Sequence, residues 1–115
     1  MMNALDIFRI LDEIAYPVGS VLKYHMRKRL KRDPSGLLEK DPKAFYDLLK
    51  EILGLNADAF LIVLSDVLKR EYEVGLSGEK LIRALRENDK DYVRYLLDKV
   101  RSREQLGPRP RFVFS

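Results

Sequence analysis

The chain has 115 residues, of which 46% are hydrophobic and 35% charged, with no cysteine and a formal net charge of +4. This length predicts one domain that can bury a sizeable core without covalent cross-links. The lack of cysteine excludes disulfides, thiolate zinc sites and a cysteine nucleophile. The chain begins Met-Met-Asn and reaches Asp6 without a signal-peptide pattern, so we expect a cytoplasmic protein.

Side-chain amides are scarce in this charge-rich chain. They occur only at Asn3, Asn56, Asn88 and Gln105. A composition that is rich in charge, poor in amides and free of cysteine is typical of hyperthermophile proteins. We therefore expect a thermophilic source.

Apolar residues recur at three- and four-residue spacing along most of the chain, which predicts amphipathic helices. The expected helices cover about residues 4–15, 18–32, 42–53, 57–73, 78–87 and 89–103. No stretch alternates at period two over enough residues to predict a strand. We therefore predict an all-α protein, with a single-domain bundle of five or six helices over residues 1–105. The two prolines in residues 106–115 predict an extended C-terminal tail.

The helix expected at 57–73 is the predicted centre of this bundle. Its segment Ala59–Leu64 is apolar at every position, and a helix that is apolar all round must be covered on several sides. Its main apolar stripe consists of Phe60, Val63, Leu64, Val67, Leu68 and Tyr72. Leu61 and Ile62 point elsewhere and need a second neighbour. The apolar run is far shorter than the roughly 20 residues that cross a bilayer, so we expect no membrane association.

No motif in the sequence indicates catalysis. The chain has a single histidine, His25, and lacks metal-ligand pairs, a glycine-rich phosphate loop and a Gly-x-Ser-x-Gly elbow. We therefore expect a non-enzyme, with no catalytic residue, metal, cofactor or small-molecule substrate. His25 lies among Val21, Leu22 and Met26, which favours a buried or half-buried core histidine over a small catalytic site near His25.

A basic stretch within residues 17–32, which contains no acid, is the main clue to a binding partner. Its candidate contacts for nucleic acid or another anion are Lys23, Tyr24, Arg27, Lys28, Lys31 and Arg32. Cations on one side of a helix would follow a phosphate backbone, and Tyr24 would stack a base. The alternative is an ordinary charged surface, neutralised by acids of other segments such as Glu13, Glu39 and Asp33.

A second nucleic-acid hypothesis uses the corner within residues 57–87. Two helices joined by a short glycine-containing turn resemble a helix-turn-helix, in which Lys80, Arg83 and Arg86 would face a DNA groove. Helical bundles contain many such corners, and acids such as Glu79 share the second helix.

The chain ends in an apolar segment, Phe112, Val113 and Phe114. Free termini are usually polar, so we expect this segment to dock on its own domain, on a second copy or on a partner. Tyr95, which lies off the inward stripe of its helix, is a further candidate interface residue. These residues favour self-association or binding to another protein.

The run Asp41-Pro42-Lys43-Ala44-Phe45-Tyr46-Asp47-Leu48-Leu49-Lys50-Glu51-Ile52-Leu53-Gly54, followed by Ala57 and Ala59-Phe60, resembles a small archaeal helical family. The family is the Nitrosopumilus-type output domain, a domain of unknown function, and the resemblance covers roughly residues 5–75. It implies a helical module of archaeal signalling or regulatory proteins, with no catalytic residues to carry over. The basic stretch from Lys23 to Arg32 departs from the family pattern.

Three functional hypotheses follow from these observations. The first is a non-catalytic protein-interaction or regulatory module that self-associates. The second is a nucleic-acid-binding protein, through the basic stretch or the helix-turn-helix. The third is a small enzyme with a site near His25.

Overall fold

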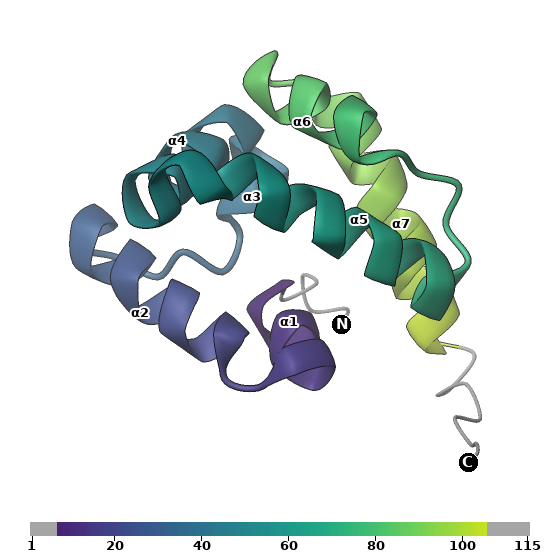
Figure 1. Ribbon diagram of the computed structural model, residues 1–115, viewed down its shortest axis with the longest axis horizontal. Coiled ribbons are helices and arrows are strands. Elements are labelled where there is room, and N and C mark those ends of the chain that lie inside the picture. The colour runs from purple at the N-terminus through teal and green to yellow at the C-terminus, as the bar shows by residue number, and fades with distance from the viewer. Residues whose placement is uncertain (1–6, 106–115) are drawn as a thin grey trace.

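Residues 7–105, which this computed structural model describes, form helices joined by short turns (Figure 1). In chain order the elements are α1 (Ile7–Ala15), α2 (Val18–Leu30), α3 (Leu37–Lys40), α4 (Pro42–Leu53), the 3-10 turn η1 (Gly54–Asn56), α5 (Ala57–Tyr72), α6 (Gly78–Arg86) and α7 (Lys90–Gln105). No strand occurs among these residues, so the predicted all-α bundle is confirmed. The interface candidates Phe112, Val113 and Phe114 lie outside the described residues.

The helix starts follow local sequence signals. The Asp41 side chain accepts a hydrogen bond from the Ala44 backbone N–H at 3.2 Å, and Pro42 occupies the first helical position of α4. Ser77 caps α6 in the same way, since its hydroxyl oxygen accepts from the Lys80 N–H at 3.1 Å. These caps satisfy backbone donors that a helix cannot satisfy internally.

Helix α5 runs across the middle of the molecule, with α1 and α2 on one side and α6 on the other, and α7 crosses behind it (Figure 1). Its closest partner is α6, while α2 packs mainly on α1 and also on α4. The rings of Phe8 in α1 and Phe45 in α4 lie 6.2 Å apart, centre to centre, inside the shared core. The largest fully buried side chains include Phe8, Ile10, Met26, Leu49, Leu61 and Leu85.

The expectation that α5 is covered on several sides at Ala59–Leu64 is wrong. Leu61 and Leu64 are buried, but Ile62 is exposed, and Val63 of the predicted main stripe retains 60% of its accessible surface. The buried face of α5 consists of Ala57, Leu61, Leu64, Ser65 and Leu68. The buried face differs from the predicted stripe because α5 packs on α6 and α7. This packing leaves the flank that carries Val63 without a neighbouring helix.

Helices α1 and α2 meet at a very close contact around Gly19. A Cβ atom at position 19 would lie 1.8 Å from the backbone carbonyl oxygen of Phe8, so only glycine fits there. One turn further along α1, the Asp12 carboxylate accepts hydrogen bonds from the Ser20 N–H at 2.9 Å and from the Ser20 hydroxyl at 2.5 Å. Asp12 thereby caps the positive N-terminal end of α2 from the neighbouring helix.

We expect Gly19→Ala to lower the free energy of unfolding by about 3 kcal/mol, the upper end of typical overpacking costs. Alanine normally stabilises a helix relative to glycine, so a loss here reports the clash with the Phe8 carbonyl. Urea denaturation measures it. The matched control is Gly75→Ala, since nothing lies within 4 Å of a Cβ at that position. An unchanged midpoint for Gly19→Ala would show that α1 and α2 are further apart.

The Asp12–Ser20 contact makes a pH-dependent contribution to stability. The hydrogen bond from the Ser20 hydroxyl is the main cause that lowers the pKa of Asp12 below its ordinary value. A carboxylate with a lowered pKa stabilises the fold above the unfolded-state pKa, and this contribution is lost as the pH falls through the folded-state pKa. Ser20→Ala should therefore destabilise the protein at pH 7 and have a smaller effect below about pH 3.

Denaturant midpoints at the two pH values measure this difference. The control is Ser102→Ala, which changes an exposed serine of α7. Equal destabilisation by Ser20→Ala at both pH values would mean that the hydroxyl acts without the charge of Asp12.

The orientation of α5 is tested by a pair of truncations on the same helix. Leu61→Ala removes a buried side chain and should cost about 2–5 kcal/mol of unfolding free energy. Val63→Ala removes an exposed side chain and should stay within about 0.5 kcal/mol of the wild type. Thermal or urea unfolding measures both. Comparable losses at the two positions would restore the stripe that the sequence predicts.

Candidate functional site

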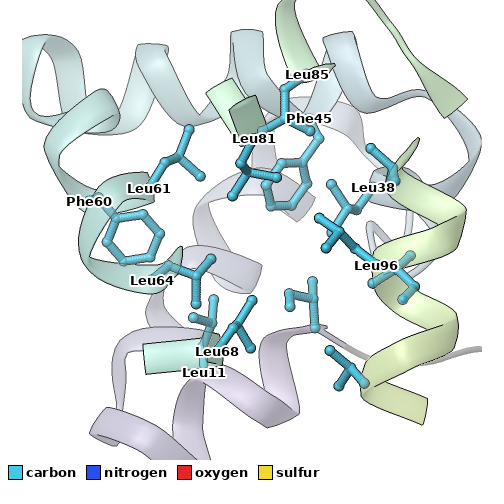
Figure 2. Close-up of a pocket in the computed structure, with 14 residues that line it drawn as sticks. Leu11, Leu38, Phe45, Phe60, Leu61, Leu64, Leu68, Leu81, Leu85 and Leu96 are labelled. Atoms are coloured by element: carbon cyan, nitrogen blue, oxygen red, sulfur yellow. The ribbon is translucent and has the colours of Figure 1, made fainter. Parts of the chain in front are cut away.

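The molecule has a cavity at its centre, where α1, α3, α4, α5, α6 and α7 meet (Figure 2). Its volume is about 40 Å³, and all of its lining side chains are apolar, including Phe45, Leu61, Leu64 and Leu96. The volume would admit a water molecule, but a buried water needs polar partners, and the lining offers none. The cavity is a dry packing defect of the core and holds no group that can act on a ligand.

A second hollow is an open groove of about 370 Å³ between α2 and α5. The residues that line this groove are Pro17, Val18, Val21, Leu22, His25, Ile52, Leu53 and Phe60. One wall is therefore α2, the floor is the end of α4, and the other wall is the start of α5. All but His25 are apolar.

The register of α2 explains how one helix serves both the core and the groove. Residues at i, i+3, i+4 and i+7 share a helix face, and Val18, Val21, Leu22 and His25 have this spacing. Leu22 is buried towards α1 and α4, whereas Val21 retains 47% of its accessible surface. On the solvent side of this face come Tyr24 and Lys28, which follow Val21 at three and seven residues. Tyr24 and Lys28 are not among the groove-lining residues, but this spacing places them on the same side of α2 as Val21.

The facing wall belongs to the uncovered flank of α5. Phe60 is half-buried and lines the groove, and Val63 stands one turn further along the same flank towards solvent. Leu55 in η1, next to the groove-lining Leu53, is 96% exposed. Ile62 lies on a different flank, against the start of α6. A Cβ atom at position 78, which is glycine, would lie 2.9 Å from Ile62 Cγ1.

His25 is half-buried in the groove wall, in agreement with the expectation of a half-buried histidine. Its ring meets the Tyr24 ring edge-on at 5.3 Å, and its backbone carbonyl accepts a hydrogen bond from Arg29 Nη1 at 3.3 Å. The other groove-lining side chains offer no carboxylate, hydroxyl or amine to act with the imidazole. The described residues also contain no group of three histidine, cysteine, aspartate or glutamate side chains that could hold a metal ion.

The predicted basic contacts lie together along α2 and its C-terminal turn. Arg27, Lys28, Lys31 and Arg32 are exposed, and no ion pair joins them to an acid in the described part of the chain. Tyr24 retains 57% of its accessible surface, and Lys28 Nζ lies 5.6 Å from its ring centre. Lys23 is half-buried. We call Arg27, Lys28, Lys31 and Arg32 the basic cluster.

Acids of other segments do not neutralise the basic cluster as the alternative interpretation expects. Glu13 pairs with Arg9 at 2.5 Å, and Glu39 lies 4.0 Å from Arg94 and 3.8 Å from Arg101. Asp33 is the exception. The pKa of Asp33 is lowered mainly by its hydrogen bonds from Ser35, with a further contribution from nearby cations that include Arg27.

Arg29, which the sequence places among apolar residues of α2, has a structural partner. Its Nε atom lies 3.3 Å from the Glu51 carboxylate on α4, which ties α2 to α4 beside the groove. The pair is partly exposed, so its contribution to stability is small. Arg29 is therefore neutralised and does not belong to the basic cluster.

The helix-turn-helix hypothesis gains little from the geometry. Residues 73–77, rather than the usual three- to four-residue turn, separate α5 from α6. Lys80 Nζ lies 5.0 Å from the Tyr92 ring centre, and Arg83 and Arg86 share a polar surface hollow with Glu79 and Glu87. The exposed face of α6 thus mixes both signs of charge.

Tyr95 is exposed on α7, as expected, with its ring 6.3 Å from Tyr92 and 5.6 Å from Lys99 Nζ. No residue of α7 lines the groove, so Tyr95 is not part of that site. The groove itself was missed in the sequence. The signal that could have found it is the unbroken apolar run at Ala59–Leu64, which is wider than a one-sided helix needs.

Comparison with known proteins finds no matching family model, no matching curated protein and no matching solved structure. The resemblance to the Nitrosopumilus-type output domain therefore stays a prediction. None of the helices in the described part of the chain combines the length and apolarity that a bilayer crossing requires.

Proposed function

We propose that the chain is a non-catalytic protein-interaction module that docks a partner in the groove between α2 and α5. The observation that carries this proposal is the groove itself, an open hollow whose lining is apolar except for His25. Val21 and Val63 extend its two walls into solvent, in a chain where 35% of the residues are charged. Contiguous exposed apolar surface of this kind is typical of binding sites.

Burial of apolar surface supplies the driving force for docking. Each Å² of apolar surface removed from water contributes roughly 25 cal/mol, before the cost of association. Val21, Val63 and Leu55 keep much of their surface in the isolated chain and would be covered by a partner. The groove floor at Ile52 and Leu53 gives a partner side chain a concave seat.

Nucleic-acid binding is the competing function, and one observation favours it. The basic cluster is exposed and unpaired among the described residues, beside the exposed ring of Tyr24. A phosphate backbone would, however, leave the apolar groove uncovered, and Asp33 lies within electrostatic reach of Arg27. A protein partner accounts for both the groove and the exposed Lys28 on the same side of α2.

The proposal is tested by selecting displayed peptides on the immobilised full chain. We expect enriched peptides whose affinity falls at least about tenfold on the double variant Val21→Asp with Val63→Asp, because a carboxylate in the groove wall at position 21 and one beyond Phe60 at position 63 must be desolvated on docking. Both positions are exposed, so the melting temperature should change little. Fluorescence anisotropy measures the affinities.

The matched control is Tyr95→Ala on α7, which removes an exposed aromatic side chain outside the groove and should leave binding unchanged. The proposal fails if no peptide is enriched, or if the enriched peptides bind the double variant as tightly as the wild type.

A further inference from the structure

We infer that the segment docked in the groove is an acidic amphipathic helix of a partner protein. Its apolar stripe lies on Val21, Leu53 and Phe60, and its carboxylates face Lys28. This inference rests on the proposed docking function and adds the chemistry of the partner.

The walls of the groove favour a helix over an extended peptide. The α2 residues that line it, Val18 to His25, span two helical turns, about 10 Å along the axis. An extended peptide usually docks by adding to a strand edge, and the described residues contain no strand. A helix satisfies its own backbone hydrogen bonds and needs only an apolar stripe at i, i+3, i+4 and i+7 to fill such a groove.

The charge on the rim favours an acidic partner. Lys28 follows Val21 by seven residues on the solvent side of the α2 wall and is unpaired among the described residues. Arg27, Lys31 and Arg32 add to the positive field around it, whereas Arg29 is already paired with Glu51. On α5, Phe60 lines the groove, and the exposed Ala59 and Val63 near it in the helix carry no charge. Carboxylates on the α2 side of a docked helix therefore gain attraction without meeting a facing acid.

The chain's own segments fit this charge pattern poorly. The C-terminal segment carries Arg109 and Arg111 beside Phe112, so docking it here would bring further cations to the basic cluster. A second copy joined groove to groove by a two-fold axis would set the same surface patch against itself. The basic clusters of the two copies would then approach each other, and like charges at an interface are unfavourable.

The inference is tested with two synthetic helical peptides that have the same apolar stripe. One peptide carries glutamate and the other carries lysine at the flanking positions. Anisotropy titrations use the full chain in low and in physiological salt. We expect the glutamate peptide to bind at least about tenfold more tightly in low salt, with the ratio shrinking as salt screens the charges. Lys28→Glu combined with Lys31→Glu should abolish or reverse the preference. Lys90→Glu, an exposed lysine at the start of α7, is the matched control and should keep it.

The remaining outcomes separate this inference from the proposed function. If peptides bind in the groove with equal affinity whichever charge they carry, the inference of an acidic helix is wrong. The proposed docking function then still holds. If sedimentation shows that the chain forms a dimer, and Val63→Asp dissociates this dimer, the groove binds a second copy and the inference is wrong. If a labelled oligonucleotide displaces the glutamate peptide and its binding requires Lys28 and Lys31, the basic cluster binds nucleic acid. This outcome also overturns the inference.

Discussion

The packing of α5 on α6 is the constraint on which the rest of the structure depends. Gly78 at the start of α6 leaves room for Ile62, and Leu61, Leu64 and Leu68 face the core between these helices and α7. Helices α6 and α7 pack on one side of α5, and Val63 on another flank retains 60% of its accessible surface. Phe60 and Val63 fall on that uncovered flank. The groove is therefore a direct consequence of which side of α5 the C-terminal helices occupy.

The other wall is held in place by contacts that do not involve α5. Gly19 lets α2 lie against the backbone of Phe8 in α1, and the Asp12–Ser20 hydrogen bonds fix the start of α2 on the same helix. The Arg29–Glu51 pair ties α2 to α4. These contacts are all made within the chain, so the position of α2 does not depend on contacts with a partner.

Much of the fold could be predicted from the sequence, because helix signals are local. The apolar spacing and the caps at Asp41 and Ser77 lie within a few residues of the elements that they define. The burial of α5 could not be predicted, since six consecutive apolar residues are compatible with burial on any flank and only the tertiary neighbours choose one. The pairing of Glu39 with Arg101 depends on the same long-range packing. The basic stretch was visible in the sequence, but the apolar groove lined by Val21, on whose side of α2 Lys28 lies, was not.

Helix stability alone does not explain the cations of α2. Cations in the last turn of a helix are stabilised by its dipole, and Arg27 and Lys28 gain from this position. The dipole effect falls off within one turn and is weak for exposed side chains, so it does not require the further cations Lys31 and Arg32. Nor do ion pairs with other described residues account for the cluster. An apolar groove alone would discriminate poorly between partners, because burial of apolar surface is non-directional. A one-sided charge on its rim adds direction and selects against basic segments.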